Sequence, residues 1–159
     1  MSFEINLAKE NFKFSGTHFT ILSPEKAERL HGHNYYVQVS LLVEQLDPIL
    51  GLAFDFNSIK PLVREACAAL DEFILLPQNS PFLKIRHEAG QVEVTFAGRR
   101  YSFPQNDVRE LPLVNITSEE LSRFLAGQIN TLAKNLKFSA LTVSVEETRG
   151  QGVSYTLRR

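Results

Sequence analysis

Cysteine is almost absent from this chain of 159 residues, and the single Cys67 excludes an internal disulfide framework and any zinc site built from several cysteines. The sequence also lacks a surplus of charge of one sign, because 17 basic residues stand against 18 acidic ones and the formal net charge is -1. A protein that binds nucleic acid or an anionic membrane through its overall charge is therefore disfavoured. Long hydrophobic runs are missing as well, so no segment is expected to span a membrane.

The N-terminal segment, residues 1–14, has charged residues where a secretory signal needs an apolar run. Together with the single cysteine, this predicts a cytoplasmic protein. Hydrophobic residues make up 43% of the sequence, enough for a domain of this length to bury a core. We therefore expect a single domain over residues 1–159.

Alternation of apolar and polar residues predicts strands at both ends of the chain. Near the N-terminus, strands are expected over 3–8, 12–21 and 33–44. Alternate residues of the third strand share one face, namely Tyr35, Val37, Val39, Leu41 and Val43. Near the C-terminus a turn at 150–152 separates two further strands. In the first of these, one face carries Leu141, Val143, Val145 and Glu147.

Two segments between these strands have helical spacing. The first helix is expected between Asp55 and Phe73, with an apolar stripe formed by Ile59, Leu62, Val63, Ala66, Cys67 and Leu70. The second begins at Thr117, three residues before Glu120 in a capping-box pattern. Its stripe consists of Leu121, Phe124, Leu125, Ile129 and Leu132.

Between the helices, the runs 92–96 and 101–103 predict a hairpin that turns near Gly98, inside an inserted segment of about 84–112. The predicted fold class is α+β, with a four-stranded antiparallel sheet, two helices on one face and the inserted hairpin. Open sheet edges and a face without helices favour a homo-oligomer that joins sheets edge to edge.

Three of the four histidines lie within sixteen positions. His31 and His33 are two residues apart, so in a strand their imidazoles point to one face. His18 comes from the preceding strand and could supply a third nitrogen to a metal, leaving an open coordination position as catalytic zinc sites do. The alternative is a turn with solvated imidazoles and an unrelated His18. His87 has no partner in the sequence and is expected to be an exposed loop residue.

The ordered motifs of the chain resemble those of one family. They are Phe14-Ser15-Gly16-Thr17-His18-Phe19, Arg29-Leu30-His31-Gly32-His33-Asn34-Tyr35, Asp55-Phe56 with Lys60, Asn115-Ile116-Thr117-Ser118-Glu119, and Val145-Glu146-Glu147-Thr148. This series resembles the 6-pyruvoyl-tetrahydropterin synthase family, which includes the bacterial 6-carboxy-tetrahydropterin synthases. The resemblance implies the tunnelling fold, in which trimers close their sheets into a barrel, two trimers form a hexamer, and active sites lie at subunit interfaces.

The resemblance also implies a pterin substrate, usually dihydroneopterin triphosphate, and Zn²⁺ held by His18, His31 and His33. Glu147 matches the family's pterin anchor, and one carboxylate can accept two parallel N–H bonds from a pterin ring. A solvated glutamate at a strand end is the alternative, disfavoured because Glu147 shares a face with apolar residues. Thr117 and Glu119 match the segment near the pterin, and both also suit a helix N-terminus.

Two family features are altered. The cysteine base of other members would stand at Ala27, and Cys67 cannot replace it because it falls in the buried stripe of the first helix. The Asp-His pair that follows that helix becomes Asp71-Glu72. We expect Asp71 to have a supporting role in catalysis, while the role of Glu72 is left open.

Glu28 forms Glu-x-x-His-Gly-His and resembles the folate-pathway paralogues in which a glutamate replaces the cysteine. Beside zinc its pKa could be tuned toward the working pH, so that it acts as general base. Glu25 competes for this role. The predicted function is a zinc-dependent pterin lyase or isomerase, with 6-hydroxymethyl-dihydropterin as the product. The alternatives are a 6-pyruvoyl- or 6-carboxy-tetrahydropterin synthase that uses acidic residues, and a binding protein without activity.

Overall fold

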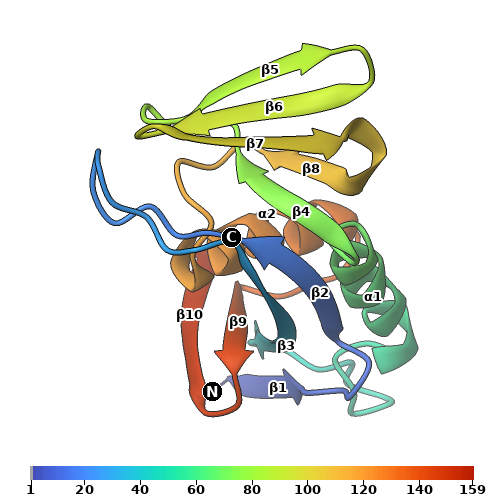
Figure 1. Cartoon of the computed structure of the whole chain (residues 1–159). Coiled ribbons are helices and arrows are strands. Elements are labelled where there is room, and N and C mark those ends of the chain that lie inside the picture. The colour runs from blue at the N-terminus through green and yellow to red at the C-terminus, as the bar shows by residue number, and fades with distance from the viewer. Residues whose placement is uncertain (1) are drawn as a thin grey trace.

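The computed structural model describes residues 2–159 and is dominated by a curved sheet (Figure 1). The strands of this sheet are β1 (Phe3–Leu7), β2 (Lys13–His18), β3 (His31–Val43), β4 (Phe73–Pro77), β8 (Val108–Leu111), β9 (Ala140–Thr148) and β10 (Gln151–Arg158). They follow the order β10-β9-β3-β2-β4-β8. The long β3 pairs with β2 along its first half and with β1 along its second half.

The expected antiparallel unit of four strands is present as β10, β9, β3 and β2. The observed sheet is larger than the four strands expected. β1 pairs with β3, and β4 and β8 add two parallel strands beyond β2. The two added parallel strands are short, and β4 is a continuous apolar run, so neither has the alternation that marks a half-exposed strand.

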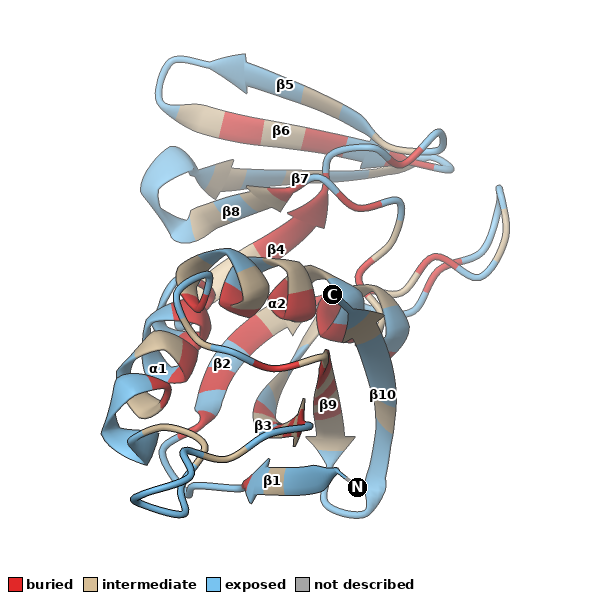
Figure 2. Ribbon diagram, turned by 180° about the vertical axis from the view of Figure 1, so that it is seen from behind, coloured by how far each residue is buried: buried red, intermediate tan, exposed pale blue. Residues whose placement is uncertain are grey.

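Helices α1 (Lys60–Ala68) and α2 (Ser118–Leu132) cover the same face of the sheet (Figure 2). The N-cap of α2 is Thr117, whose hydroxyl accepts a hydrogen bond from the Glu120 amide at 3.3 Å. Only this half of the capping box forms, because the Glu120 carboxylate pairs with Arg123 instead. The first helix is shorter than expected, since the chain leaves it after Ala68 and Glu72 takes a left-handed φ of 63° before β4 begins.

The inserted segment forms a separate sheet of three antiparallel strands, β5 (Lys84–Glu88), β6 (Gln91–Phe96) and β7 (Arg99–Pro104), which we call the outer sheet. The expected hairpin is its β6–β7 pair, and β5 was missed. His87 is exposed as expected, but it lies on β5 and not in a loop, and its ring nitrogen pairs with Glu110 of β8 at 2.8 Å.

Two hydrophobic clusters follow from this arrangement. The main cluster lies between the large sheet and the helices, and it contains the predicted faces of β3, β9 and α2 together with Cys67. The second cluster lies beneath the outer sheet and joins it to β4 and to residues 19–30; its buried members are Phe19, Ile21, Ala27, Leu76, Val92, Val94 and Phe96. No helix within residues 2–159 is both long and apolar enough to cross a membrane.

Candidate active site

The three histidines of the two motifs lie together where β2 ends and β3 begins. His18 stands directly opposite His31 in the ladder between these strands, and His33 follows on the same side of β3. Ring centroids are 4.8 Å apart for His18 and His31, 5.3 Å for His18 and His33, and 4.8 Å for His31 and His33. One potential ligand nitrogen from each residue lies within 4.8 Å of the others. We call these three residues the histidine cradle.

Backbone carbonyls orient two of these rings. The Nδ1 of His18 donates to the Ile116 carbonyl at 3.0 Å, and the Nδ1 of His31 donates to the Arg29 carbonyl at 2.7 Å. Because a carbonyl can only accept, each of these rings carries a proton on Nδ1, and Nε2 is the nitrogen left to face a metal. Metal-binding histidines are commonly held in this way.

The residues of the cradle fit a zinc ion. His18 is buried, and its Nε2 has no hydrogen-bond partner within the described part of the chain. Burial lowers the pKa of His18, which favours the neutral imidazole that a metal requires. A buried, unpaired nitrogen facing two further imidazoles is the arrangement of a three-histidine zinc site with an open position.

Residues 19–30, which we call the arm, connect β2 to β3 and carry Glu28 (Figure 1). The arm folds back on itself through one bridge between Ile21 and Ala27, and the Glu28 amide donates to the Thr20 carbonyl at 3.0 Å. This pairing places a carboxylate oxygen of Glu28 3.9 Å from Nε2 of His31. Glu25 lies in the exposed turn of the arm, where its amide bonds to the Ser23 hydroxyl.

Glu28 is partly exposed, and its environment differs from the one expected. Burial acts to raise its pKa, but hydrogen bonds from Thr20 and the nearby His31 and His18 outweigh this and hold the pKa below its usual value. The expected tuning of the pKa toward the working pH concerned a site with zinc bound; in the free chain the pKa of Glu28 is shifted downward. Glu28 is ionised at neutral pH, which is the form that can accept a proton.

Asn115 fixes the arm to the segment that leads into α2. Its side-chain oxygen accepts from the Ile21 amide at 3.0 Å, and its amide nitrogen donates to the Ile21 carbonyl at 2.8 Å. The next residue, Ile116, supplies the carbonyl that orients His18. The motif of residues 115–119 thus holds the arm, a histidine and the helix cap at once. The motif was recognised in the sequence, but the role of Asn115 in fixing the arm was not predicted.

Beside the cradle, Thr117, Glu119 and Glu147 border one pocket of about 280 Å³. Its other lining residues are Thr20, Ser118, Gln151, Gly152 and Val153. A register shift between Gln151 and Gly152 makes a β-bulge, with Glu147 as the extra residue of β9. Gly152 is required there, because a Cβ at this position would come within 2.6 Å of the Val145 carbonyl oxygen.

Tyr35 lies beside the cradle and near Glu147, and it was not predicted as a site residue. Its side chain is fully buried, 5.6 Å from the His33 ring centroid and 5.9 Å from that of His18. Its hydroxyl has no hydrogen-bond partner within residues 2–159, and burial together with the nearby charges of Glu147 and Glu28 raises the pKa of Tyr35. A buried hydroxyl beside a carboxylate is a ready hydrogen-bond donor.

Asp71 and Glu72 lie at the joint between α1 and β4, outside the pocket that Glu147 lines. A carboxylate oxygen of Asp71 accepts from the Ser15 amide at 2.7 Å, and the Glu72 amide donates to the Ser15 carbonyl at 2.8 Å. Glu72 borders another pocket, of about 300 Å³, together with His33 and Asn34. In this chain Asp71 holds β2 in place. Cys67 is buried, and burial raises the pKa of its thiol to about 12.

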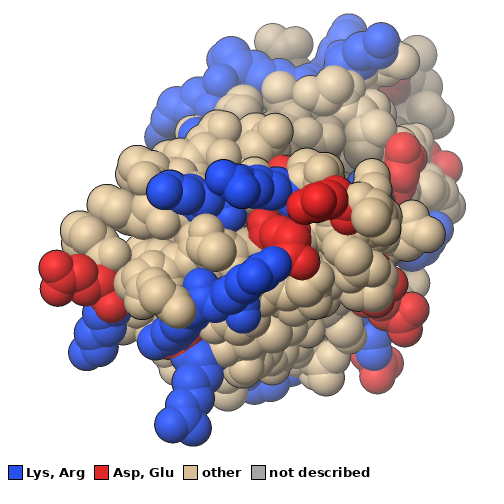
Figure 3. All heavy atoms as spheres, turned by 45° about the horizontal axis from the view of Figure 1, so that its top comes forward, with Lys and Arg blue, Asp and Glu red and all other residues tan. Residues whose placement is uncertain are grey.

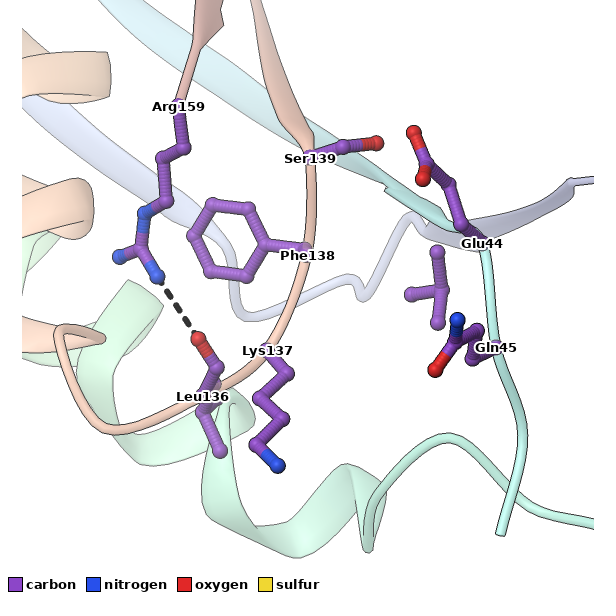
Figure 4. Close-up of a pocket in the computed structure, with 8 residues that line it drawn as sticks. Glu44, Gln45, Leu136, Lys137, Phe138, Ser139 and Arg159 are labelled. Atoms are coloured by element: carbon purple, nitrogen blue, oxygen red, sulfur yellow. Dashed lines mark hydrogen bonds between the residues drawn. The ribbon is translucent and has the colours of Figure 1, made fainter. Parts of the chain in front are cut away.

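A larger pocket of about 490 Å³ lies where β3 ends (Figure 4). It is roughly 40 Å from the cradle along the strand, at about 3.3 Å per residue over the 13 residues of β3. Its arginine, Arg159, is engaged by the Leu136 carbonyl at 2.7 Å and by the Phe138 ring. The guanidinium of Arg159 is therefore already bonded within the protein. This pocket also lacks the grouped histidines and acids that lie in and beside the pocket of Glu147.

Comparisons with known proteins agree with this geometry. The family model described as 6-pyruvoyl tetrahydropterin synthase matches residues 7–158. A Methanocaldococcus jannaschii protein with the provisional name 6-carboxy-5,6,7,8-tetrahydropterin synthase is 33% identical, and the match covers 98% of this chain and 96% of the relative.

Solved structures give the same result. The crystal structure of 6-pyruvoyl tetrahydropterin synthase from Plasmodium vivax superposes with a TM-score of 0.93 at 26% identity, covering 100% of this chain and 99% of the other. A variant of that protein, in which a glutamate described as a catalytic residue is replaced by alanine, has the same TM-score at 25% identity and the same coverage. The fold is thus the tunnelling fold, shared with solved pterin synthases. The chain belongs to the 6-pyruvoyl tetrahydropterin synthase family.

Proposed function

We propose that the chain, acting over residues 1–159 as one pterin-binding domain, is a zinc-dependent lyase or isomerase. Its substrate would be 7,8-dihydroneopterin triphosphate or a close relative, and its product 6-hydroxymethyl-dihydropterin. The observation that carries this proposal is the Glu28 carboxylate, 3.9 Å from His31 in a cradle of three histidines. In the similar Plasmodium vivax protein a glutamate is likewise named as catalytic.

Each group of site residues has its own role in the proposed reaction. Glu147 accepts two N–H bonds from the pterin ring in the pocket, while Thr117 and Glu119 border the same space. His18, His31 and His33 hold zinc, which when bound supplies a Lewis acid next to the substrate side chain. Glu28, ionised and beside the cradle, removes a proton from that side chain. Asp71 supports the site by fixing β2.

The assembly is part of the proposal. The strands β8 and β10 end the strand order of the large sheet, so each leaves one backbone edge unpaired within residues 2–159. A trimer that joins these edges, and a hexamer of two trimers, would cover them. Light scattering on the purified protein should give a mass close to six chains of 18.0 kDa. A monomer would contradict this part of the proposal.

The function is tested by incubating zinc-loaded protein with dihydroneopterin triphosphate and identifying the product by mass spectrometry. Glu28→Gln should lower turnover while zinc content and pterin binding stay unchanged. Glu25→Gln is the matched control, because this acid lies in the exposed turn of the same arm and should keep full turnover. If Glu28→Gln turned over substrate as fast as wild type, Glu28 would not be the base.

A second candidate is 6-carboxy-tetrahydropterin synthase, which the name of the Methanocaldococcus jannaschii relative favours. The same assay separates the two candidates, because the carboxylated and the hydroxymethyl products differ in mass. No product, combined with tight pterin binding at stoichiometric zinc, would instead identify a binding protein without activity.

A further inference from the structure

The outer sheet contacts the arm directly through Arg99, the first residue of β7. One terminal nitrogen of its guanidinium donates to the Glu28 carbonyl at 2.7 Å, and the other donates to the Ala27 carbonyl at 3.0 Å. The planar guanidinium thereby holds two consecutive backbone carbonyls, one of them belonging to the proposed base. A lysine ammonium also has several donors, but it lacks this fixed planar arrangement.

A tight turn aims Arg99 at the arm. Ala97 and Gly98 both have left-handed φ values, 46° and 81°, as required in the two-residue turn that matches the twist of a hairpin. Phe96 and Arg99 form the pair that closes this turn. The left-handed conformation is unfavourable for alanine. The outer sheet thus presents Arg99 directly after a tight two-residue turn.

The arm has few supports of its own. Its internal pairing is one bridge, Ile21 to Ala27, with backbone hydrogen bonds among Leu22, Ser23 and Lys26 at its turn, where β2 and β3 have a continuous ladder. Asn115 holds the arm at Ile21, and the outer sheet holds it at residues 27 and 28: Ala27 is buried with Phe96 in the second cluster, and Arg99 binds the two carbonyls. Without Arg99, the Glu28 end of the arm would keep only its pairing with Thr20 and the packing of Ala27.

We propose that Arg99 is a positioning residue for the general base, so that the outer sheet sets the place of the Glu28 carboxylate relative to the histidine cradle. This inference rests on the proposed role of Glu28. Arg99 acts on the backbone of residues 27 and 28 and leaves the carboxylate free for substrate. It should therefore affect the catalytic step and leave pterin affinity and zinc binding unchanged.

Arg100 provides the matched control. It follows Arg99 directly, but it pairs with Glu93 of the same sheet at 2.9 Å. Figure 3 shows this side of the molecule, where Lys and Arg side chains lie beside Asp and Glu instead of forming a field of one sign. Arg100→Met therefore removes the same charge from the same strand without touching the arm.

The experiment compares wild type, Arg99→Met, Arg99→Lys and Arg100→Met in two assays. Hydrogen exchange without substrate should show faster exchange in residues 22–30 of Arg99→Met only, including the Glu28 amide that bonds to Thr20. In turnover, Arg99→Met should lower kcat about 10- to 100-fold at unchanged KM and zinc content, and Arg99→Lys should lie between it and wild type. In a Glu28→Gln background, Arg99→Met should cause no further loss.

Each outcome decides the inference. The inference would be overturned if hydrogen exchange in the arm of Arg99→Met were as slow as in wild type. It would also be overturned if Arg99→Met lowered kcat by the same factor in the Glu28→Gln background as in the wild-type background. A wild type without turnover would overturn the proposed function and with it the catalytic consequence, while the exchange result would still decide whether Arg99 holds the arm. The two failures are therefore distinguishable.

Discussion

The histidine cradle and the arm lie side by side in the site, but they are held in different ways. The cradle stands on two strands with a continuous ladder, and the carbonyls of Arg29 and Ile116 orient two of its rings. The arm has one bridge of its own and depends on Asn115 and Arg99, which come from distant parts of the chain. The groups proposed to hold the metal therefore stand on paired strands and are oriented by backbone carbonyls, whereas the proposed base depends on the side chains of Asn115 and Arg99.

The largest effect on zinc affinity and turnover is expected when one histidine of the cradle is removed. His18→Ala removes the buried imidazole and should weaken zinc affinity by more than about 100-fold, because even outer partners of metal ligands are worth about 10- to 100-fold. Turnover should be lost with the metal. Chelator competition and elemental analysis after dialysis measure this. His87→Ala is the control, since His87 of the outer sheet pairs with Glu110 of β8 and its loss should leave zinc binding unchanged.

Asn115→Ala tests the residue that connects the two regions. It frees the Ile21 backbone and also removes the acceptor for the Ile116 amide, next to the carbonyl that orients His18. We expect kcat to fall about 10- to 100-fold, and zinc affinity to fall about 10-fold. Asn130→Ala, which loses a hydrogen bond to Arg159 far from the site, should change neither. Normal turnover in Asn115→Ala would show that the arm does not need this support.

The difference between the two regions also explains what the sequence could predict. The cradle was predictable because strand alternation puts His31 and His33 on one face and a hairpin neighbour brings His18 opposite. The exposed and buried faces of β3 and β9 and the cap of α2 follow from the same local rules and are confirmed. Each of these depends on residues that are close in sequence or directly paired.

The supports of the arm could not be predicted in this way. Asn115 lies 94 positions from Ile21, and Arg99 lies 71 positions from Glu28, so no local pattern connects them. The contact of Arg99 depends on where β4 and β8 place the outer sheet, and these short strands were missed because they lack alternation. The bulge at Glu147 was hidden for a similar reason, since Gly152 reads as part of a simple turn in the sequence.

Gly152→Ala tests whether the bulge at the pocket is as constrained as the cradle. The added Cβ would meet the Val145 carbonyl oxygen at 2.6 Å, so the strands must shift and we expect a loss of about 2 kcal/mol in the free energy of unfolding. The KM for the pterin should rise because Glu147 moves. Gly127→Ala is the opposite control, since its Cβ meets nothing within 4 Å inside α2 and alanine should stabilise that helix by about 1 kcal/mol. Urea unfolding measures both variants.

The smallest effect is expected at the cap of α2, where a site residue also has a local structural role. Thr117→Ala removes the hydroxyl that accepts from the Glu120 amide, and should lower the free energy of unfolding by about 1 kcal/mol. Thr131→Ala in the same helix removes a hydroxyl that bonds only to the Gly127 carbonyl, and should be neutral or slightly stabilising. If Thr117→Ala also raises the KM for the pterin, the hydroxyl contributes to the pocket as well as to the cap. If stability falls and KM does not change, Thr117 serves only to begin the helix, and pterin binding in this pocket rests on Glu147 and Glu119.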